Sequence, residues 1–209
     1  MAKELTNDVE KLSYALGMDV AFSFKSLPTE VDADALIAGF TAIFNDETPV
    51  LGEKEFAETM QKFQMDMQKK SMEMQQEAAA QSKAAGEAYL AENKEREGVQ
   101  VTESGLQYEV LVEGEGEMPT ADSTVTVHYT GTLIDGTVFD SSVERGQPAT
   151  FPLKGVIPGW TEALQLMSVG SKFRLTIPSH LAYGERGAGQ QIAPNSTLIF
   201  EVELLGIEG

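Results

Sequence analysis

The segment TVTVHYTGTLIDGTVFDSS, residues 124–142, is the most informative part of this chain for its architecture. Its first ten residues alternate between apolar and polar side chains, which is typical of a half-buried strand. Asp135-Gly136 then provides a strong signal for a tight hairpin turn, and residues 138–140 form a second short strand pattern. The segment therefore predicts two antiparallel strands joined by a turn.

Further short β patterns flank this hairpin in the second half of the chain. They lie at residues 106–112, 150–153, 171–177 and 197–205. A single helical pattern runs from Trp160 to Met167, with its apolar side chains on one face. Many strands with one short helix favour an α+β fold, in which an antiparallel sheet wraps around the helix.

The first half of the chain has helical periodicity instead. Apolar residues recur every three or four positions over residues 5–20, and Pro28 closes this first helix. A second helix is expected with its apolar face over residues 36–44, and either Asp32 or Asp34 can cap its N-terminus. This half is thus expected to be all-α.

A third, long helix is expected to begin near Glu53 and to run to Glu97, where Gly98 stops it. Its front half carries an apolar stripe of Phe and Met, whereas its back half is polar on most sides, as in a solvent-exposed bridge. We predict an N-terminal helical dimerisation domain over residues 1–52, a linker helix over 53–97 and a β-rich domain over 98–209.

The helical part is small but rich in Phe and Met, and a unit of this size buries only a limited fraction of its surface. We therefore infer that it gains further burial by self-association, most simply as a two-fold dimer. The alternative is a modest monomeric bundle.

The composition excludes several classes of function. The formal net charge is −18, so the clustered Lys and Arg that nucleic-acid binding requires are not expected. The chain has no Cys, which excludes disulfide scaffolds, thiolate metal sites and Cys nucleophiles. No apolar run could span a bilayer, and the polar start lacks a secretory signal. The sequence as given predicts a cytoplasmic protein. If a signal peptide was removed from it, we expect a periplasmic or outer-membrane-associated protein instead.

Motifs for metal, phosphate or nucleophilic chemistry are incomplete. His128 and His180 are the only histidines and fit no zinc pattern, and strand alternation places His128 on the outward face. The glycine-rich run at residues 184–189 lacks the Lys-Ser/Thr pair of a P-loop, so it is interpreted as a flexible surface loop. Ser141 and Ser142 have no GxSxG context. Neither a metal nor a cofactor is expected.

An excess of aromatic residues beside turns is the remaining feature of the second half. Most of them are expected in the core of a domain of this size. Asp140 fits that interpretation less well, because a carboxylate in an apolar strand needs a partner, which Arg145 could supply five residues on. Trp160 lies at a loop-to-helix junction, where a Trp can form the floor of a pocket.

Four ordered motifs of this half resemble the FKBP-type peptidyl-prolyl cis–trans isomerases, the tacrolimus-binding immunophilins. They are VHYTGTLIDGTVFDSS (127–142), GVIPGW (155–160), LAYGERG (181–187) and TLIFEVELL (197–205). The helical half, with KLSYALGMDV (11–20) and the long third helix, resembles the macrophage infectivity potentiator branch of that family. The resemblance implies an intertwined dimer of the N-terminal helices, with the long helix holding the catalytic domain away from it.

The resemblance also implies which residues act. Trp160 is expected as the floor of a proline pocket, and Arg145 as a brace for Asp140 and Tyr129. The Tyr183 hydroxyl and the Ile157 N–H are expected to hydrogen-bond a bound peptide or macrolide. The expected catalytic residues are Tyr129, Phe139, Asp140, Trp160 and Tyr183, and the expected substrate- or inhibitor-binding residues are Arg145, Phe151, Val156, Ile157, Ile192 and Phe200. Ala149 and the 184–194 loop depart from the family pattern at the pocket rim, which concerns substrate preference and inhibitor affinity rather than the reaction.

Together these features predict an isomerase of X–Pro bonds in unfolded or partly folded proteins, which accelerates proline-limited folding and binds tacrolimus or rapamycin. It is expected to use an apolar pocket and no nucleophile, metal or general base, and its dimer is expected to bind clients as a chaperone does. The Met-rich stripe supports an alternative, a holdase chaperone with secondary isomerase activity, in which the two arms of a V-shaped dimer hold an unfolded chain. A third reading, a binding module without turnover, requires the polar pocket residues to be absent, yet Asp140, Tyr183 and Trp160 are present.

Overall fold

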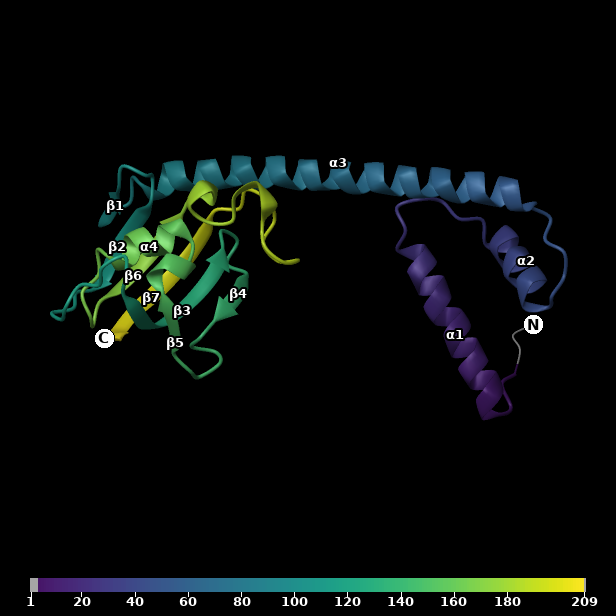
Figure 1. Ribbon diagram of the computed structural model, residues 1–209, viewed down its shortest axis with the longest axis horizontal. Coiled ribbons are helices and arrows are strands. Elements are labelled where there is room, and N and C mark those ends of the chain that lie inside the picture. The colour runs from purple at the N-terminus through teal and green to yellow at the C-terminus, as the bar shows by residue number, and fades with distance from the viewer. Residues whose placement is uncertain (1–3, 209) are drawn as a thin grey trace. The chain divides into compact units, whose positions relative to one another are not determined.

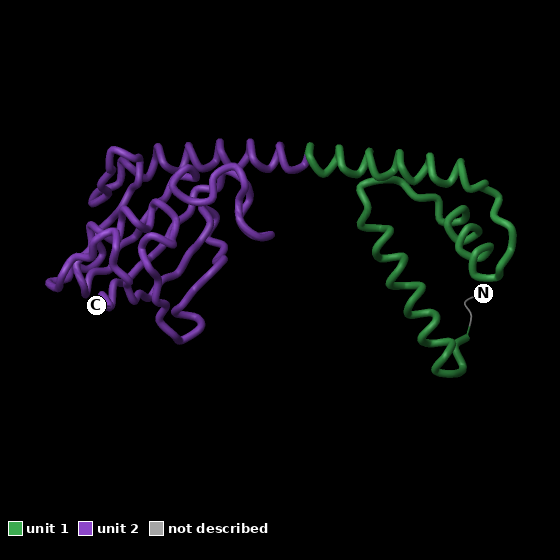
Figure 2. The backbone as a smooth tube through the Cα atoms, viewed as in Figure 1, with its two compact units in different colours: residues 1–73 green, residues 74–209 purple. Residues whose placement is uncertain are grey.

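The computed structural model describes residues 4–208 and divides into two compact units, Met1–Glu73 and Met74–Gly209 (Figures 1 and 2). The boundary between them falls inside the long helix α3, Glu53–Asn93, so each unit contains part of this helix. No helix within residues 4–208 has the combined length and hydropathy needed to cross a bilayer.

Unit 1 consists of α1, Asp8–Lys25, α2, Ala33–Phe44, and the front of α3. Side-chain caps begin the first two helices. The Glu10 N–H donates to Asn7 Oδ1 at 3.0 Å, and the Ala35 N–H donates to Asp32 Oδ1 at 2.9 Å. Each cap satisfies a backbone donor that the first helical turn leaves free. Of the two candidate caps of the second helix, Asp32 is therefore the one used.

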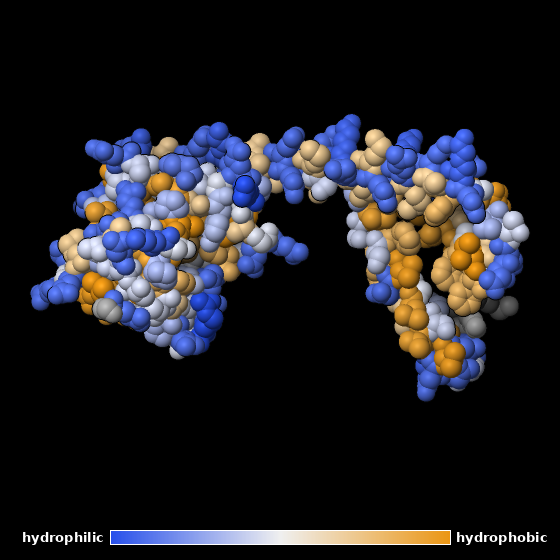
Figure 3. All heavy atoms as spheres, in the orientation of Figure 1, coloured by the Kyte–Doolittle hydropathy of each residue, from blue (hydrophilic) through white to orange (hydrophobic). Residues whose placement is uncertain are grey.

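The apolar stripes predicted for α1 and α2 are present but uncovered. Neither helix has a buried residue, and large side chains such as Leu16 (59% exposed) and Phe40 (61% exposed) face solvent. Figure 3 shows the hydrophobic side chains gathered along these helices. An apolar surface of this kind marks an interaction site in a soluble protein.

Unit 2 contains an antiparallel sheet, the short helix α4 and three 3-10 turns (Figure 1). In the described residues the strand order is β1-β2-β6-β7-β3-β4, and β5 pairs with β3. The elements are β1 Val99–Val101, β2 Gln107–Val112, β3 Thr124–Leu133, β4 Val138–Ser141, β5 Ala149–Pro152, η1 Leu153–Gly155, α4 Pro158–Leu164, β6 Lys172–Ile177, η2 Ser179–Leu181, η3 Gly184–Arg186 and β7 Leu198–Glu208. The predicted α+β fold, helical in front and sheet-rich behind, is confirmed.

The core of unit 2 lies between the sheet and α4. Alternate residues of β3, including Val125 and Val127, are fully buried, while their neighbours are partly exposed. Helix α4 contributes Trp160, Ala163 and Leu164 to the same core. The period-two pattern of β3 therefore predicts correctly which of its faces packs on the helix.

Several boundaries differ from the sequence-based expectation. Helix α3 ends at Asn93 rather than Glu97, because the next residues form tighter i→i−3 hydrogen bonds, such as Arg96 N–H to Asn93 O at 3.1 Å. Helix α4 begins at Pro158, whose fixed φ suits a first helical position. Strand β1 has no counterpart in the prediction, since a three-residue run carries too little periodicity to be recognised.

The back half of α3 is also different from the solvent-exposed bridge that its polar sequence indicates. Gly86 and Asn93 are buried, and a Cβ at Gly86 would lie 2.4 Å from Thr197 Oγ1. Asn93 Nδ2 donates to Gln107 Oε1 at 2.8 Å, and Gln107 Nε2 donates to the Leu90 carbonyl at 2.9 Å. One face of this half therefore packs closely on the sheet of unit 2, through small and amide side chains rather than large apolar ones.

Candidate functional site

Five aromatic rings from different elements meet inside unit 2. We call them the aromatic cluster: Tyr129 on β3, Phe139 on β4, Phe151 on β5, Trp160 on α4 and Phe200 on β7. The Trp160 ring is central, with its centroid 5.1 Å from that of Tyr129, 5.7 Å from that of Phe151 and 5.3 Å from that of Phe200, all edge to face. Edge-to-face packing of this kind is favourable between aromatic rings.

The rings of the aromatic cluster differ in their exposure to solvent. Trp160 and Phe200 are each 4% exposed, whereas Phe139 and Phe151 are only partly buried. Within residues 4–208, the Trp160 Nε1 is the one buried side-chain N or O atom that lacks a hydrogen-bond partner. A buried donor without a partner is unusual in a folded protein. Trp160 is thus the buried centre of the aromatic cluster, and Phe139 and Phe151 are its more exposed members.

Close backbone approach makes this arrangement possible. A Cβ at Gly131 of β3 would lie 2.7 Å from ring atoms of both Phe139 and Phe200, so only glycine lets the two rings reach each other across the strand. Their centroids are 5.5 Å apart. Gly131 is opposite Asp140 in the β3–β4 ladder, beside a register shift. The packing role of Gly131 has no signal in the sequence beyond the residue itself.

A polar network adjoins the aromatic cluster. The Tyr129 hydroxyl donates a hydrogen bond to Asp140 Oδ2, and Arg145 Nη1 donates another to Asp140 Oδ1. Arg145 Nη2 also donates to the Tyr129 hydroxyl at 3.1 Å, and its guanidinium carbon lies 5.8 Å from the centre of the Tyr129 ring. The partner that Asp140 was expected to need is therefore Arg145, as predicted.

The network fixes the charge state of its members. Burial pushes the pKa of Asp140 upward, but the hydrogen bonds from Tyr129 and Arg145 and the charge of Arg145 outweigh it, so this pKa lies below its ordinary value. Burial and the hydrogen bond to Asp140 raise the pKa of Tyr129. The site therefore presents a carboxylate and a neutral phenol near neutral pH.

Three further residues of the expected pocket, Val156, Ile157 and Ile192, belong to the same packed core as the aromatic cluster. Val156 and Ile157 lead into α4 and pack against the core, and Ile192 is 8% exposed. Tyr183 is 41% exposed, and its hydroxyl has no hydrogen bond to any part of residues 4–208. The Ile157 N–H, just before the first turn of α4, likewise has no partner within those residues. These two donors are thus available to a ligand.

The loop that contains Ile192 is more ordered in shape than the flexible surface loop expected from its glycines. It starts with η3, and Ala188 and Ile192 form an antiparallel bridge, in which the Ala188 N–H donates to the Ile192 carbonyl at 2.9 Å. At Gly187, where φ is +63°, a Cβ would lie 2.2 Å from the Ile192 carbonyl oxygen. The glycine thus permits the bridge that brings Ile192 into the core.

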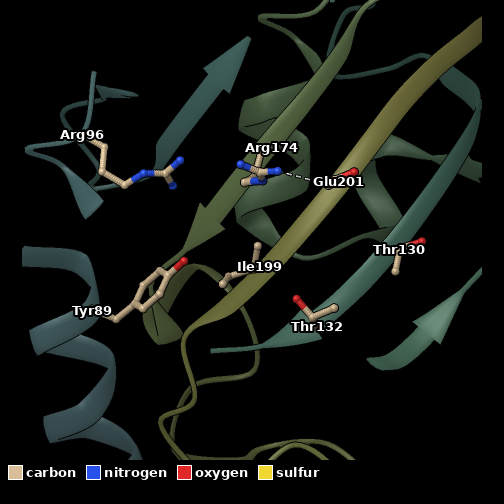
Figure 4. A pocket seen from close by; sticks show the side chains of 7 residues that line it. All are labelled: Tyr89, Arg96, Thr130, Thr132, Arg174, Ile199 and Glu201. Atoms are coloured by element: carbon tan, nitrogen blue, oxygen red, sulfur yellow. Dashed lines mark hydrogen bonds and ion pairs between the residues drawn. The ribbon is translucent and has the colours of Figure 1, made fainter. Parts of the chain in front are cut away.

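A hollow of about 350 Å³ lies on the face of the sheet opposite the aromatic cluster (Figure 4). Thr130 and Thr132 line it, and they alternate along β3 with the residues that face the aromatic cluster. Its Arg174 is neutralised by Glu201 at 2.8 Å and Glu109 at 3.2 Å. The remaining lining residues are Tyr89, Arg96 and Ile199. None of these residues was expected from the sequence to form a site.

The motifs set aside in the sequence have structural contacts. His128 Nδ1 lies 3.1 Å from Ser142 Oγ, and His180 Nε2 lies 3.0 Å from the Ser104 carbonyl oxygen. In the described part of the chain no three His, Asp or Glu side chains gather as a metal site would require. Ser141 and Ser142 are buried and bonded to β3.

The chain is similar to known proteins in both sequence and fold. Residues 115–205 match the family described as FKBP-type peptidyl-prolyl cis-trans isomerase, and residues 9–110 match the domain amino terminal to it. The chain is 48% identical over 196 residues to the FKBP-type 22 kDa peptidyl-prolyl cis-trans isomerase of Escherichia coli strain K12, with 93% of each chain covered. It is 44% identical over 207 residues to the outer membrane protein MIP of Legionella longbeachae, covering 99% of this chain and 89% of that one. The crystal structure of FkpA from Escherichia coli superimposes with a TM-score of 0.81 at 40% identity, covering 98% of this chain and 99% of that one.

Proposed function

The chain belongs to the FKBP-type peptidyl-prolyl cis–trans isomerases and is an enzyme of that type. We propose that it acts at the aromatic cluster, on X–Pro bonds whose isomerisation limits protein folding. The observation that carries the proposal is the network of Tyr129, Asp140 and Arg145 beside a graded, partly exposed set of rings. The mechanism is non-covalent.

The chemistry follows from amide resonance. Rotation about X–Pro is slow because the C–N bond has partial double-bond character, which also places negative charge on the carbonyl oxygen. Water stabilises that charge separation in the planar amide, and the twisted transition state has lost it. An apolar aromatic surface around the proline therefore disfavours the planar amide relative to the twisted one. Only such a preference for the transition state accelerates the reaction.

The polar groups around the aromatic cluster have positioning roles in this proposal. The Tyr183 hydroxyl and the Ile157 N–H, which have no partner in residues 4–208, hydrogen-bond the peptide on either side of the proline. Holding the flanking peptide in a turn lowers the orientational cost of reaching the twisted state. Asp140 acts as an electrostatic and structural element, because its low pKa keeps it ionised and makes it a poor proton donor.

A refolding assay tests this function. The full chain should accelerate the slow, proline-limited phase of a denatured client and the cis-to-trans conversion of a Leu-Pro or Phe-Pro peptide, and tacrolimus or rapamycin should abolish both effects by occupying the aromatic cluster. Acceleration that persists with the macrolide bound would contradict the location of the site. A client with all X–Pro bonds already trans provides the control, because its refolding should not change.

We also propose that the chain is a homodimer through its N-terminal helices. The support is the uncovered apolar surface of α1 and α2, which includes Leu12, Leu16, Phe40 and Ile43. Covering it with the same surface of a second copy gives a closed two-fold interface. Sedimentation of the full chain at micromolar concentration should give twice the 22.6 kDa of one chain. A single species of monomer mass would contradict the dimer.

A second candidate function, a holdase chaperone with secondary isomerase activity, is favoured by one observation. Met65, Met72 and Met74 of α3 are 63%, 55% and 63% exposed, and flexible, polarizable Met side chains suit variable apolar partners. Full-length chain carrying Asp140→Leu separates the two functions. If this variant still suppresses aggregation of a proline-free client at the same molar ratio of chaperone to client as the wild type, the result supports the holdase function. If suppression of aggregation falls together with isomerase activity, a dimeric isomerase without a separate holdase function explains both observations.

A further inference from the structure

Strand β3 has a gap along the edge that faces β4 and β5. β5 pairs with Thr124–Val127, and β4 pairs with Thr130–Thr132. Tyr129 lies in the gap between these two ladders, and its backbone there has no strand to pair with. An unpaired backbone N–H and C=O in a buried position would cost free energy comparable to a lost hydrogen bond each.

Ser142, the first residue after β4, fills this gap. Its N–H donates to the Tyr129 carbonyl at 3.0 Å, and its Oγ accepts the Tyr129 N–H at 2.8 Å. Ser142 is completely buried, at 0% exposure. One residue thus replaces both hydrogen bonds that a paired strand would supply, and the side chain provides one of them.

Two further contacts hold the same residue. The Ser142 Oγ lies 3.1 Å from His128 Nδ1, which reaches it from the neighbouring residue of β3. The Ser142 carbonyl accepts the Gln147 N–H at 3.2 Å and so closes the turn that carries Arg145. Ser142 is therefore connected to both of the groups that bind Asp140, through the backbone of Tyr129 and through the turn of Arg145.

We propose that Ser142 is a positioning residue for the isomerase reaction, which acts through Tyr129 by fixing the backbone from which the Tyr129 hydroxyl reaches Asp140. The Tyr129 ring is rigid, so a shift of its backbone moves the hydroxyl by a similar amount. A displacement of even part of an ångström lengthens the hydrogen bond to Asp140 and alters the polar edge of the aromatic cluster. This inference rests on the part proposed above for Tyr129 and Asp140.

Ser141 provides a matched control. It is also buried, at 4% exposure, and its backbone pairs with Thr130 in the β3–β4 ladder. Its Oγ lies 2.9 Å from Thr130 Oγ1 and 3.5 Å from the Tyr129 carbonyl oxygen, and it accepts the Glu144 N–H of the same turn at 3.2 Å. Ser141→Ala therefore removes a neighbouring buried hydroxyl that also holds this turn, but it keeps the acceptor of the Tyr129 N–H. Both variants lose a buried hydrogen bond, so both should lower the melting temperature, and Ser142→Ala should lower it more because it leaves the Tyr129 N–H without its acceptor.

The test compares the two variants by kcat and KM for a Leu-Pro peptide. Ser142→Ala should lower kcat roughly five- to tenfold with KM within about twofold, because a mispositioned group weakens the transition state more than the bound ground state. Ser141→Ala should leave both constants within about twofold. Equal effects of the two substitutions, or an unchanged kcat for Ser142→Ala, would overturn the inference.

A double-mutant cycle separates positioning from simple destabilisation. If Ser142 acts through the Tyr129 hydroxyl, Ser142→Ala should have little further effect on kcat in a Tyr129→Phe background. Independent, multiplicative losses would show that Ser142 acts by another route and would overturn the inference. If Tyr129→Phe alone leaves kcat unchanged, the proposed role of Tyr129 fails and the inference fails with it. Should Ser142→Ala not fold, Ser142→Cys keeps the size with a much weaker acceptor and is expected to lower kcat in the same way.

Discussion

Units 1 and 2 contain apolar patterns of similar clarity, yet only one of them has a core. In α1 and α2 no residue is buried, whereas in β3 and β7 alternate residues are fully buried. Periodicity predicts which face of an element is apolar, but the partner of that face depends on what folds against it. In unit 2 the partner is the same chain, and in unit 1 we propose that it is a second copy.

The largest expected effect comes from breaking the proposed interface of unit 1. Leu16→Asp should raise the dimer dissociation constant by a hundredfold or more, since full burial of a Leu contributes about 1.5–3 kcal/mol and the two-fold interface contains it twice. Sedimentation across a dilution series measures this change. Turnover of a short Leu-Pro peptide should not change, because the substitution leaves the aromatic cluster intact.

Lys25→Glu, a charge change at the exposed end of the same helix, is the control and should leave the dimer intact. If Leu16→Asp does not weaken association, then the apolar stripe of α1 is covered by something other than a second copy, and the difference between the units needs another explanation.

The next largest effect should come from the site of unit 2. Asp140→Leu removes two charge-assisted hydrogen bonds and should lower kcat/KM for a Leu-Pro peptide by about ten- to hundredfold. The fold should remain, because the Asp140 side chain is 41% exposed and lies outside the buried core. Circular dichroism and sedimentation should match the wild type.

Asp122→Leu serves as the matched control, since Asp122 forms an exposed ion pair with Lys154 away from the network of Tyr129 and Arg145. It should retain full activity. Wild-type turnover by the Asp140 variant would remove Asp140 from the site.

The close packing of unit 2 can also be tested at helix α3, because the back half of this helix packs on the sheet through small residues. Gly86→Ala should destabilise unit 2 by about 1–3 kcal/mol through overpacking against Thr197, which exceeds the fraction of a kcal/mol by which Ala usually improves a helix. Urea unfolding followed by Trp160 fluorescence measures the change, since Trp160 is the only Trp. Glu87→Ala, at the adjacent exposed position, should have almost no effect, and a stabilising Gly86→Ala would contradict the close packing.

The parts of the fold that the sequence predicts well are those with local signals. Asp135-Gly136 predicts the turn between β3 and β4, and the five-residue spacing of Asp140 and Arg145 predicts their pairing. The docking of α3 has no such signal, because Gly86 and Asn93 interrupt rather than form an apolar stripe.

The same limit applies to the site. The aromatic residues could be named from composition and resemblance, but the roles of Gly131 and Ser142 depend on which strands end where. Gly131 matters because two rings cross over it, and Ser142 matters because β4 stops one residue short of the position opposite Tyr129. Such requirements arise only when the tertiary structure brings distant residues together.

The smallest expected effect is that of pH, and it tests whether the site works with fixed charges. The pKa of Asp140 lies below its ordinary value of about 4 and that of Tyr129 above its ordinary value of about 10. The carboxylate and the neutral phenol therefore coexist throughout the range between, so kcat/KM should be flat from about pH 5 to pH 9.

The pH dependence of stability should be determined by the same two groups, Asp140 and Tyr129. The lowered pKa of Asp140 contributes stability above pH 4 that is lost as the pH falls through the folded-state pKa, because the unfolded chain then binds a proton more readily than the folded one. The melting-temperature difference between wild type and Asp140→Asn should thus be constant above about pH 5 and shrink below about pH 4. The raised pKa of Tyr129 acts at the other end, where its contribution is lost as the pH rises above about 10. A bell-shaped profile of kcat/KM with an inflection between pH 5 and pH 8 would contradict the non-covalent mechanism. Neither Asp140 nor Tyr129 titrates in that range, so another group would have to carry a proton during the reaction.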